Sequence, residues 1–369
     1  MKLFLWAAVL ATPLLVHAQQ QPIILGAGAT FPADVYAAWG SGYAKDKQVS
    51  LQYQAVGSGE GVKRIAARQV DFGATDDPLA ASELQRLNLV QFPTIVGGLV
   101  PAYNLPGIKA GELRLSGPVI AKIYGGQIRS WDDAEIAGLN RTLRLPSLPI
   151  RRLVREESSG STRTFTRYLA LQDAAWEKRI GQKIEWPAET VAVKGTKGMT
   201  EALKSTPGAI GYVSYQEVAR QSLSAPQLQN RSGRFVLPSE RTITAAIMAS
   251  DLAKGEETAT LIDLNAPDAW PLAETTFVLV PRTMSDTAQA KRVLNFFYWV
   301  FAQGDRMAGE TGFVALPTRV QARLVSRFRD VVGPDGRPIE FLGGGCAPVL
   351  LALRPSSRPA GTLFRPAGA

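Results

Sequence analysis

The residues best suited to chemistry lie in the stretch 153–165, LVREESSGSTRTF. Arg155 presents a planar, permanently charged fork of donors that matches the geometry of a tetrahedral oxyanion. Ser159, Gly160 and Ser161 lead into the helix-forming run RTFTRYLALQ, so free amides and hydroxyls gather where the helix dipole is positive. The stretch therefore predicts an anion site, although ESSGST taken alone could equally be an ordinary helix N-cap.

Two further loops place small or hydroxyl residues before a helix. In the first, GAGATFP, the proline at position 32 favours the first turn of a helix. The amides of Thr30 and Phe31 and the Thr30 hydroxyl can then point at a bound anion. A dinucleotide fingerprint is not supported, because Phe31 occupies the place of its third glycine. In the second loop, GSGEG, Ser58 lies at a helix entry and is either a cap or a ligand contact.

A pair of carboxylates ends the strand-like run FGAT. Asp76 and Asp77 follow this run directly, before a proline. A turn or cap role would explain one of them. The other remains free for a different role.

The elements that must position these loops are strands and helices in alternation. Apolar runs such as PIIL, VSLQYQAV, FGAT, AIGYVSY and TTFVLVP alternate with helix-period stretches such as PADVYAAWGSGYAK and KRVLNFFYWVFAQG. This alternation indicates an α/β fold with parallel or mixed sheets covered by helices. At 369 residues the chain is longer than one core usually serves, so we expect two α/β lobes.

The scarcity of histidine and cysteine excludes several kinds of site. The one histidine, His17, lies in a segment that we expect to be removed, and the one cysteine is Cys346. The mature chain can therefore hold no Ser-His-Asp triad, HExxH zinc site or internal disulfide. The net charge is +9, but the basic residues are scattered, and RVQARLVSRFRD is typical of an amphipathic helix with a solvated basic face.

Both ends of the chain differ from the body. Residues 1–18 combine Lys2, an apolar run and a small-x-small cleavage pattern, which predicts a secretory signal peptide and a mature start at Gln19. The apolar run is shorter than the roughly 20 residues that a spanning helix needs. Residues 343–369 are rich in Pro, Gly, Ala and Arg without an acidic residue, and we expect a disordered tail there.

In order and spacing, these loops resemble those of the phosphate-binding proteins of bacterial phosphate ABC transporters, the PstS type. The resemblance is carried, between residues 24 and 330, by GAGATFPADVYAAW, QAVGSGEGVKRIAARQVDFGATDDPL, VREESSGSTRTFTRYL, GTKGMTEALKSTPGAIGYVSY and WPLAETTFVLVPR. It implies a two-lobed periplasmic binding protein fold (type II), in which a hinge closes two α/β lobes over an interlobe cleft. Lobe one would comprise residues 20–98 and 268–342, and lobe two residues 99–267.

The resemblance also implies a function. The protein would bind inorganic phosphate in the periplasm and deliver it to an inner-membrane ABC permease with its ATPase subunits. It would be a monomer without enzyme activity, cofactor, metal or nucleic-acid partner. The family's anion ligands would fall on Thr30, Phe31 (through its amide), Ser58, Asp76, Arg155, Ser159, Gly160 (through its amide) and Ser161, with Glu157 beside them.

The chain departs from the family pattern at several of these positions. Glu157 stands where the family commonly has aspartate, and the longer carboxylate either reaches into the pocket or turns back to pair with Arg155. Ser158 replaces a usual glycine, Ser161 a usual threonine, and Glu60 a usual small residue. Oxyanion selectivity is therefore less determined than oxyanion binding.

Selectivity for phosphate would depend on one acceptor among the donors. Phosphate still carries a proton at neutral pH, and Asp76 would accept a hydrogen bond from it, whereas sulfate would meet Asp76 with a lone pair and a like charge. The alternatives are a receptor for arsenate or sulfate, a secreted phosphate-ester hydrolase using Asp76 and Glu157 as acid and base, and a basic surface-binding protein.

Overall fold

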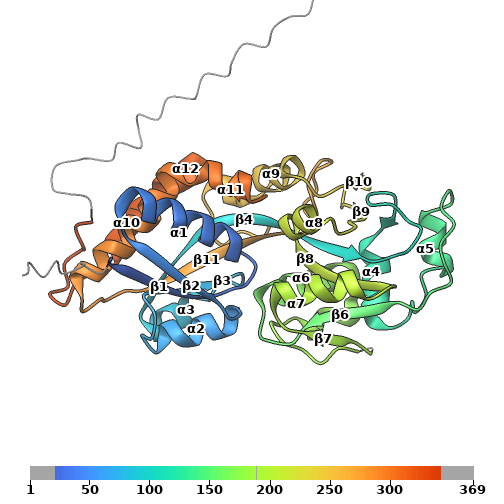
Figure 1. The fold of residues 1–369 in the computed structure, drawn as a ribbon, viewed down its shortest axis with the longest axis horizontal. Helices are drawn as coiled ribbons and strands as arrows, with labels where there is room; N and C mark the ends of the chain where they lie inside the picture. Colours follow the sequence, from blue (N-terminus) through green and yellow to red (C-terminus); the bar gives the residue numbers. More distant parts are fainter. Residues whose placement is uncertain (1–20, 188, 342–369) are drawn as a thin grey trace, which may run out of the picture.

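The longest strand, β4 (Leu89–Tyr103), is buried along its whole length. Residues 89–98 of this strand pair antiparallel with β11 (Ala273–Pro281), and residues 99–103 pair antiparallel with β8 (Ala209–Ser214). A nearly continuous apolar sequence is expected of a strand covered on both faces. β4 therefore contributes to both halves of the molecule, which lie side by side along its long axis (Figure 1).

This computed structural model describes residues 21–187 and 189–341. The predicted signal peptide, residues 1–18, and the predicted tail, residues 343–369, lie outside the described residues. Within the described part, no helix is both long enough and apolar enough to cross a membrane.

The first half is a mixed sheet with helices packed against it. Its strand order is β2–β1–β3–β11–β4, with β1 parallel to β2 and β3, and β11 antiparallel to its neighbours. Its other elements are β1 (Ile23–Gly28), α1 (Ala33–Lys47), β2 (Ser50–Ala55), α2 (Ser58–Ala66), β3 (Phe72–Thr75), α3 (Ala81–Leu87), α10 (Thr287–Gln303), α11 (Asp305–Glu310), β12 (Val314–Ala315), α12 (Thr318–Arg327) and η3 (Phe328–Asp330). Phe297 of α10 packs edge-on against Phe72 and Phe92, which joins helix and sheet in one aromatic core.

The second half continues the sheet in the order β4–β8–β6–β7, with β6 parallel to both neighbours. Its elements are α4 (Gly117–Gly125), α5 (Ala134–Leu139), β6 (Arg151–Arg155), α6 (Gly160–Gln172), η1 (Ala174–Arg179), β7 (Val191–Val193), α7 (Gly195–Ser205) and α8 (Tyr215–Gln221). Phe165 of α6 stacks on Tyr212 of β8 with ring centroids 4.6 Å apart. This stacking anchors α6, whose first turn carries the serine run, on the sheet.

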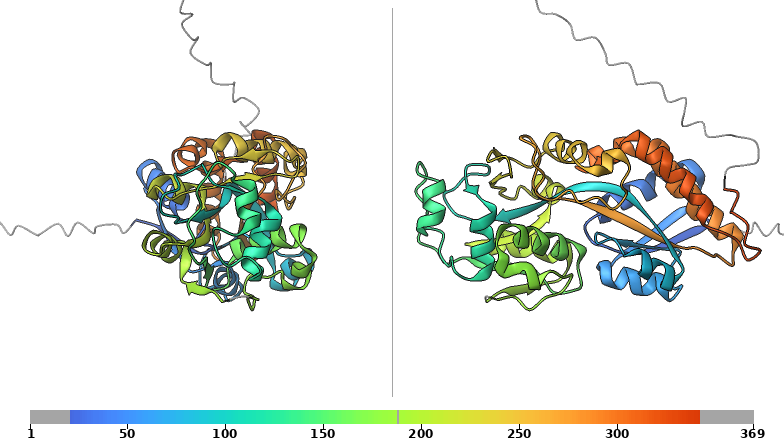
Figure 2. Two further views of the ribbon diagram at one scale, coloured as in Figure 1. Left: turned by 90° about the vertical axis from the view of Figure 1, so that its right-hand side faces the viewer. Right: turned by 180° about the vertical axis from the view of Figure 1, so that it is seen from behind.

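A smaller layer is formed by the chain between β8 and β11 together with the short strand β5 from earlier in the sequence. It comprises the sheet β10–β9–β5 and two further helices: β5 (Arg114–Leu115), β9 (Gln227–Gln229), β10 (Phe235–Val236), α9 (Glu240–Ala249) and η2 (Asp251–Lys254). Seen from behind, α9 and α12 lie along the upper edge of the molecule, above the central strand β4 (Figure 2). The α/β alternation and the mixed sheet predicted from the sequence are confirmed, as is an amphipathic helix in RVQARLVSRFRD.

Candidate anion-binding site

Arg155 lies at the carboxyl end of β6, and its side chain is only 3% exposed. Its Nη2 donates a hydrogen bond to the Thr30 hydroxyl at 2.7 Å and pairs with the carboxylate of Glu157. The second oxygen of Glu157 accepts from the backbone N–H of Gly195 at 3.0 Å. Of the two orientations that the sequence left open for Glu157, the structure has the one that pairs with Arg155.

Thr30 and Phe31 precede α1 in the first half and meet the second half. The Thr30 hydroxyl, besides accepting from Arg155, is 2.9 Å from the hydroxyl of Thr196 on α7. The carbonyl of Phe31 accepts a hydrogen bond from Gln216 at 3.4 Å, and its ring packs edge-on against Phe313. The loop GAGATFP is therefore held against the second half by polar contacts.

Ser58 joins the two halves directly. Its hydroxyl oxygen accepts from the backbone N–H of Gly160 at 3.1 Å and from that of Asp76 at 3.3 Å. It does not cap its own helix, because α2 has no side-chain cap. The alternative of a capping role for Ser58 is therefore not what the structure contains.

The first turn of α6 combines a cap with free donor capacity. Ser159 is the N-cap and accepts from the N–H of Thr162 at 3.4 Å, so the capping interpretation of ESSGST is correct for this residue. Capping uses an oxygen lone pair and leaves the Ser159 proton able to donate to an anion. The Ser161 hydroxyl donates to Glu274 at 2.7 Å.

Gly160 lies so close to the other half that a side chain would not fit. A Cβ atom at this position would lie 2.7 Å from the Cβ of Asp76 and 2.9 Å from its backbone. Real Cβ contacts are essentially never this short, so glycine is required for the approach of α6 to the loop after β3.

Asp76 is the buried acceptor of the group, with 5% of its surface exposed. Its Oδ1 accepts from the hydroxyl of Thr276 on β11 at 2.5 Å. Burial raises the pKa of Asp76 to about 7, while the Thr276 hydrogen bond and the charge of Arg155 act in the opposite direction. Asp77 turns elsewhere and forms an ion pair with Arg163 at 2.8 Å.

The structure thus brings the nine residues predicted from the sequence to the junction of the two halves, from the starts of α1, α2 and α6 and the ends of β3 and β6. Helix starts supply amides and partial positive charge, and Arg155 supplies a full one. Of these nine residues, only Asp76 has a buried carboxyl. Such a set can desolvate an oxyanion that carries a proton of its own.

Two residues of β11 also belong to this group and were not identified from the sequence. Thr276 holds Asp76, and Glu274 is 3% exposed and holds Ser161. Burial first, and then the charge of Asp76, raise the pKa of Glu274 well above its usual range. The signal available in the sequence was one acidic residue at the start of the otherwise uncharged run AETTFVLVP.

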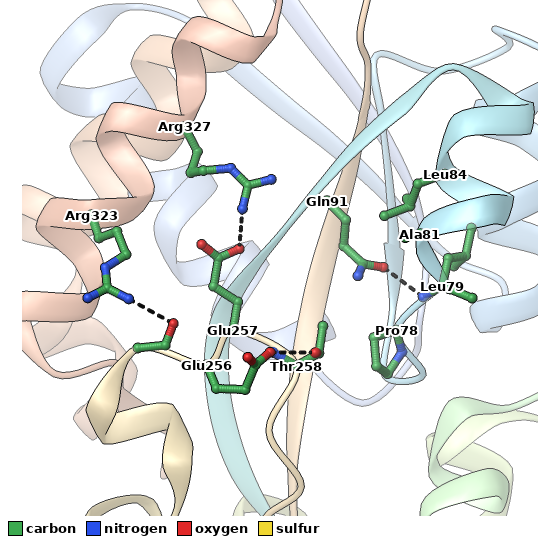
Figure 3. A pocket seen from close by; sticks show the side chains of 12 residues that line it. Pro78, Leu79, Ala81, Leu84, Gln91, Glu256, Glu257, Thr258, Arg323 and Arg327 are labelled. Atoms are coloured by element: carbon green, nitrogen blue, oxygen red, sulfur yellow. Dashed lines mark hydrogen bonds and ion pairs between the residues drawn. The ribbon is translucent and has the colours of Figure 1, made fainter.

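A separate surface pocket of about 700 Å³ lies between α3, α12 and the loop 255–258 (Figure 3). Glu257 pairs with Arg327 at 2.9 Å on its wall, and Arg323 donates to the carbonyl of Gly255 at 2.9 Å. Its polar groups are engaged with one another, and none of the nine predicted ligand residues lines it.

Among residues 21–187 and 189–341, no cluster of three or more His, Cys, Asp or Glu side chains could hold a metal ion. The nearby carboxyls Asp76 and Glu274 are held by hydroxyl groups instead.

Comparison with known proteins identifies the family of the chain. A family model described as a PBP superfamily domain matches residues 16–303. The chain is 37% identical over 312 residues to the phosphate-binding protein PstS of Haemophilus influenzae, covering 83% of this chain and 92% of that protein. It is 36% identical to the protein of the same name from Xylella fastidiosa, with 83% and 86% covered.

A solved structure supports the fold. A high affinity periplasmic phosphate-binding protein bound with phosphate superposes with a TM-score of 0.67 at 23% identity, covering 86% of this chain and 96% of that one. The predicted two-lobed α/β binding-protein fold is confirmed by this likeness.

Proposed function

Because the chain belongs to the PstS-type phosphate-binding proteins of the PBP superfamily, we propose that it binds inorganic phosphate between its lobes and delivers it to an ABC-type phosphate import permease. The proposed ligands are Thr30, Phe31, Ser58, Asp76, Arg155, Glu157, Ser159, Gly160 and Ser161. Glu157 would act by holding the Arg155 fork, since its carboxylate is engaged with Arg155 and Gly195.

The proposal rests mainly on one observation: hydrogen-bond donors from both halves lie close to the buried carboxyl of Asp76. Ser58 and Thr30 of the first half bond to Gly160 and Arg155 of the second, and Asp76 lies against Gly160. An oxyanion held at this junction would bond to both lobes at once and so favour the closed arrangement, as in hinge-closing binding proteins.

We further propose that the protein is not an enzyme and acts as a monomer in the periplasm. The relatives are named as binding proteins, which supports the first part. The lobes would be residues 20–98 with 268–342, and residues 99–267. An inner-membrane permease with its ATPase subunits would be the partner.

The test is calorimetric titration of ligand-stripped protein with phosphate, arsenate and sulfate in turn. Tight one-to-one binding of phosphate with no sulfate signal is the expected result. Arsenate carries a proton as phosphate does, so the Asp76 acceptor would not exclude it, and its binding would not contradict the site. Sulfate binding as tightly as phosphate would overturn the proposed selectivity.

A parallel incubation with a chromogenic phosphate ester addresses the hydrolase alternative. No release of chromophore above the uncatalysed rate is expected. Neither Asp76 nor Glu157 lies beside a nucleophilic side chain that a neighbouring base activates. Release that disappears in Asp76→Asn would contradict the assignment as a binding protein.

A further inference from the structure

Glu274 is a buried carboxyl without a cationic partner. It lies on β11 with 3% of its surface exposed, and its Oε1 accepts from the Ser161 hydroxyl at 2.7 Å. Its Oε2 is buried and makes no hydrogen bond of normal geometry with residues 21–187 and 189–341, although the nearby Thr164 side chain favours ionisation of Glu274. No Lys or Arg of these residues forms an ion pair with Glu274. An ionised carboxylate in such a place is costly, so the protonated form is favoured.

The charges around Glu274 come from three other elements. Asp76 follows β3 and acts against ionisation of Glu274, whereas Arg155 at the end of β6 favours it. Arg167 of α6 lines the same cavity of about 40 Å³ as Asp76 and Glu274. Residues 258–262, which line its remaining side, carry no charge. Two neighbouring buried carboxyls do not both ionise readily, so the protonation of one depends on the other.

The protonation state of Glu274 decides what Ser161 can do. A serine hydroxyl has one proton and two lone pairs. When Glu274 is ionised, Ser161 spends its proton on the carboxylate and offers only lone pairs to an anion. When Glu274 is protonated, the carboxyl O–H donates to the Ser161 oxygen, and the Ser161 proton is free to donate at the start of α6.

We propose that Glu274 is a positioning residue whose protonation, by one proton taken from solvent, frees the Ser161 hydroxyl for a bound oxyanion and so couples ligand binding to proton uptake. The proposal rests on the proposed function, because it requires the oxyanion to bind at the start of α6. The raised pKa of Glu274 agrees with it.

The experiment counts protons during phosphate binding. Inorganic phosphate is titrated into the ligand-stripped protein at a series of pH values in buffers of different ionisation enthalpy, and the slope of the measured heat against buffer enthalpy gives the protons taken up. At pH values where Glu274 is ionised in the ligand-free protein, the wild type is expected to take up as much as one proton more than Glu274→Gln, whose amide N–H donates to Ser161 permanently. As the pH rises above the pKa of Glu274 in the ligand-free protein, the wild-type affinity is expected to fall by up to about tenfold per pH unit relative to Glu274→Gln.

Control variants separate the possible causes. Glu112→Gln removes an exposed carboxylate that accepts from the backbone N–H of Lys109 and is expected to take up protons as the wild type does. Glu274→Met, of similar volume and without charge, replaces Glu274→Gln if that variant does not fold, and it too is expected to lose the extra proton.

Equal proton counts in wild-type protein and Glu274→Gln, with phosphate bound by both, would overturn the role of Glu274 alone. Phosphate binding by Glu274→Gln more than about tenfold weaker at every pH would also overturn it, because the carboxylate itself would then be needed. An absence of phosphate binding by the wild-type protein would refute the proposed function instead.

Discussion

At the scale of single residues, the burial of the Asp76 carboxyl is expected to determine which anions the candidate site accepts. Asp76 is nearly inaccessible and accepts from Thr276, so an anion without a proton would meet it as an uncompensated like charge. Ser58, Gly160 and Arg155 surround the same point with donors.

Asp76→Asn is expected to narrow the preference for phosphate over sulfate by at least about tenfold, because the amide can donate to sulfate as well as accept from phosphate. The measurement is competitive calorimetry with both anions. Asp268→Asn, at an exposed carboxylate, is the control. An unchanged ratio in a folded Asp76→Asn protein would remove Asp76 from its role.

The same carboxyl gives the ligand-free protein a pH dependence. Burial raises the folded-state pKa of Asp76 from 3.8 to about 7. Between these values the folded protein binds more protons than the unfolded chain, so this contribution to stability is complete at low pH and is lost as pH rises towards 7. Asp76→Asn removes the loss and is expected to increase the free energy of unfolding by up to about 4 kcal/mol at about pH 8.

Thermal melts of ligand-stripped wild-type and Asp76→Asn protein across this pH range show whether the variant is the more stable of the two at high pH. The advantage of the variant should shrink as the pH falls from about 7 towards 3.8 and vanish below 3.8, where the stability contribution of the protonated carboxyl is complete. An advantage that is the same at every pH would mean that ionisation of Asp76 is not its cause.

At the scale of the elements, the start of α6 makes close contacts with the first half. Phe165 stacks on Tyr212 and fixes the helix, while Gly160 allows its first turn to reach Asp76 and Ser58. Gly160 therefore both sets how closely α6 approaches the first half and supplies a backbone N–H at the start of the helix.

Gly160→Ala is expected to weaken phosphate binding at least about tenfold, because its Cβ would force α6 away from Asp76. Gly138→Ala in α5 is the matched control, since nothing lies within 4 Å of a Cβ there. Calorimetry measures affinity, and melts show whether each variant folds. Equal phosphate affinity in the two variants would contradict the close approach of α6.

Across the whole molecule, polar contacts between the halves lie beside the site as well as in it. Asp77 of the first half pairs with Arg163 at 2.8 Å and accepts from Gln182 at 2.8 Å. β4 runs through both halves and is the connection about which they would move (Figure 1).

Arg163→Ala is expected to weaken phosphate binding by up to about fivefold, because the closed arrangement loses a partly exposed ion pair worth at most about 1 kcal/mol. Small-angle scattering should then require more phosphate to reach the compact form. Arg86→Ala removes a pair within α3 and is the control. A shift of the same size in Arg86→Ala would show that the Asp77–Arg163 pair has no part in closure.

Local sequence was enough for the α/β alternation, the positions of the loops and the cap at Ser159, because these depend on neighbouring residues and on periodic burial. It was also enough to predict which hydroxyls and glycines stand at the helix starts, since these residues have a local meaning there. Contacts between distant segments needed the tertiary structure. Ser161 meets Glu274 across 113 residues of chain and Asp76 meets Thr276 across 200, because sheet pairing and lobe contact bring them together. The orientation of Glu157 was likewise open in the sequence, since pairing with Arg155 depends on where Gly195 and Thr30 lie in the closed arrangement.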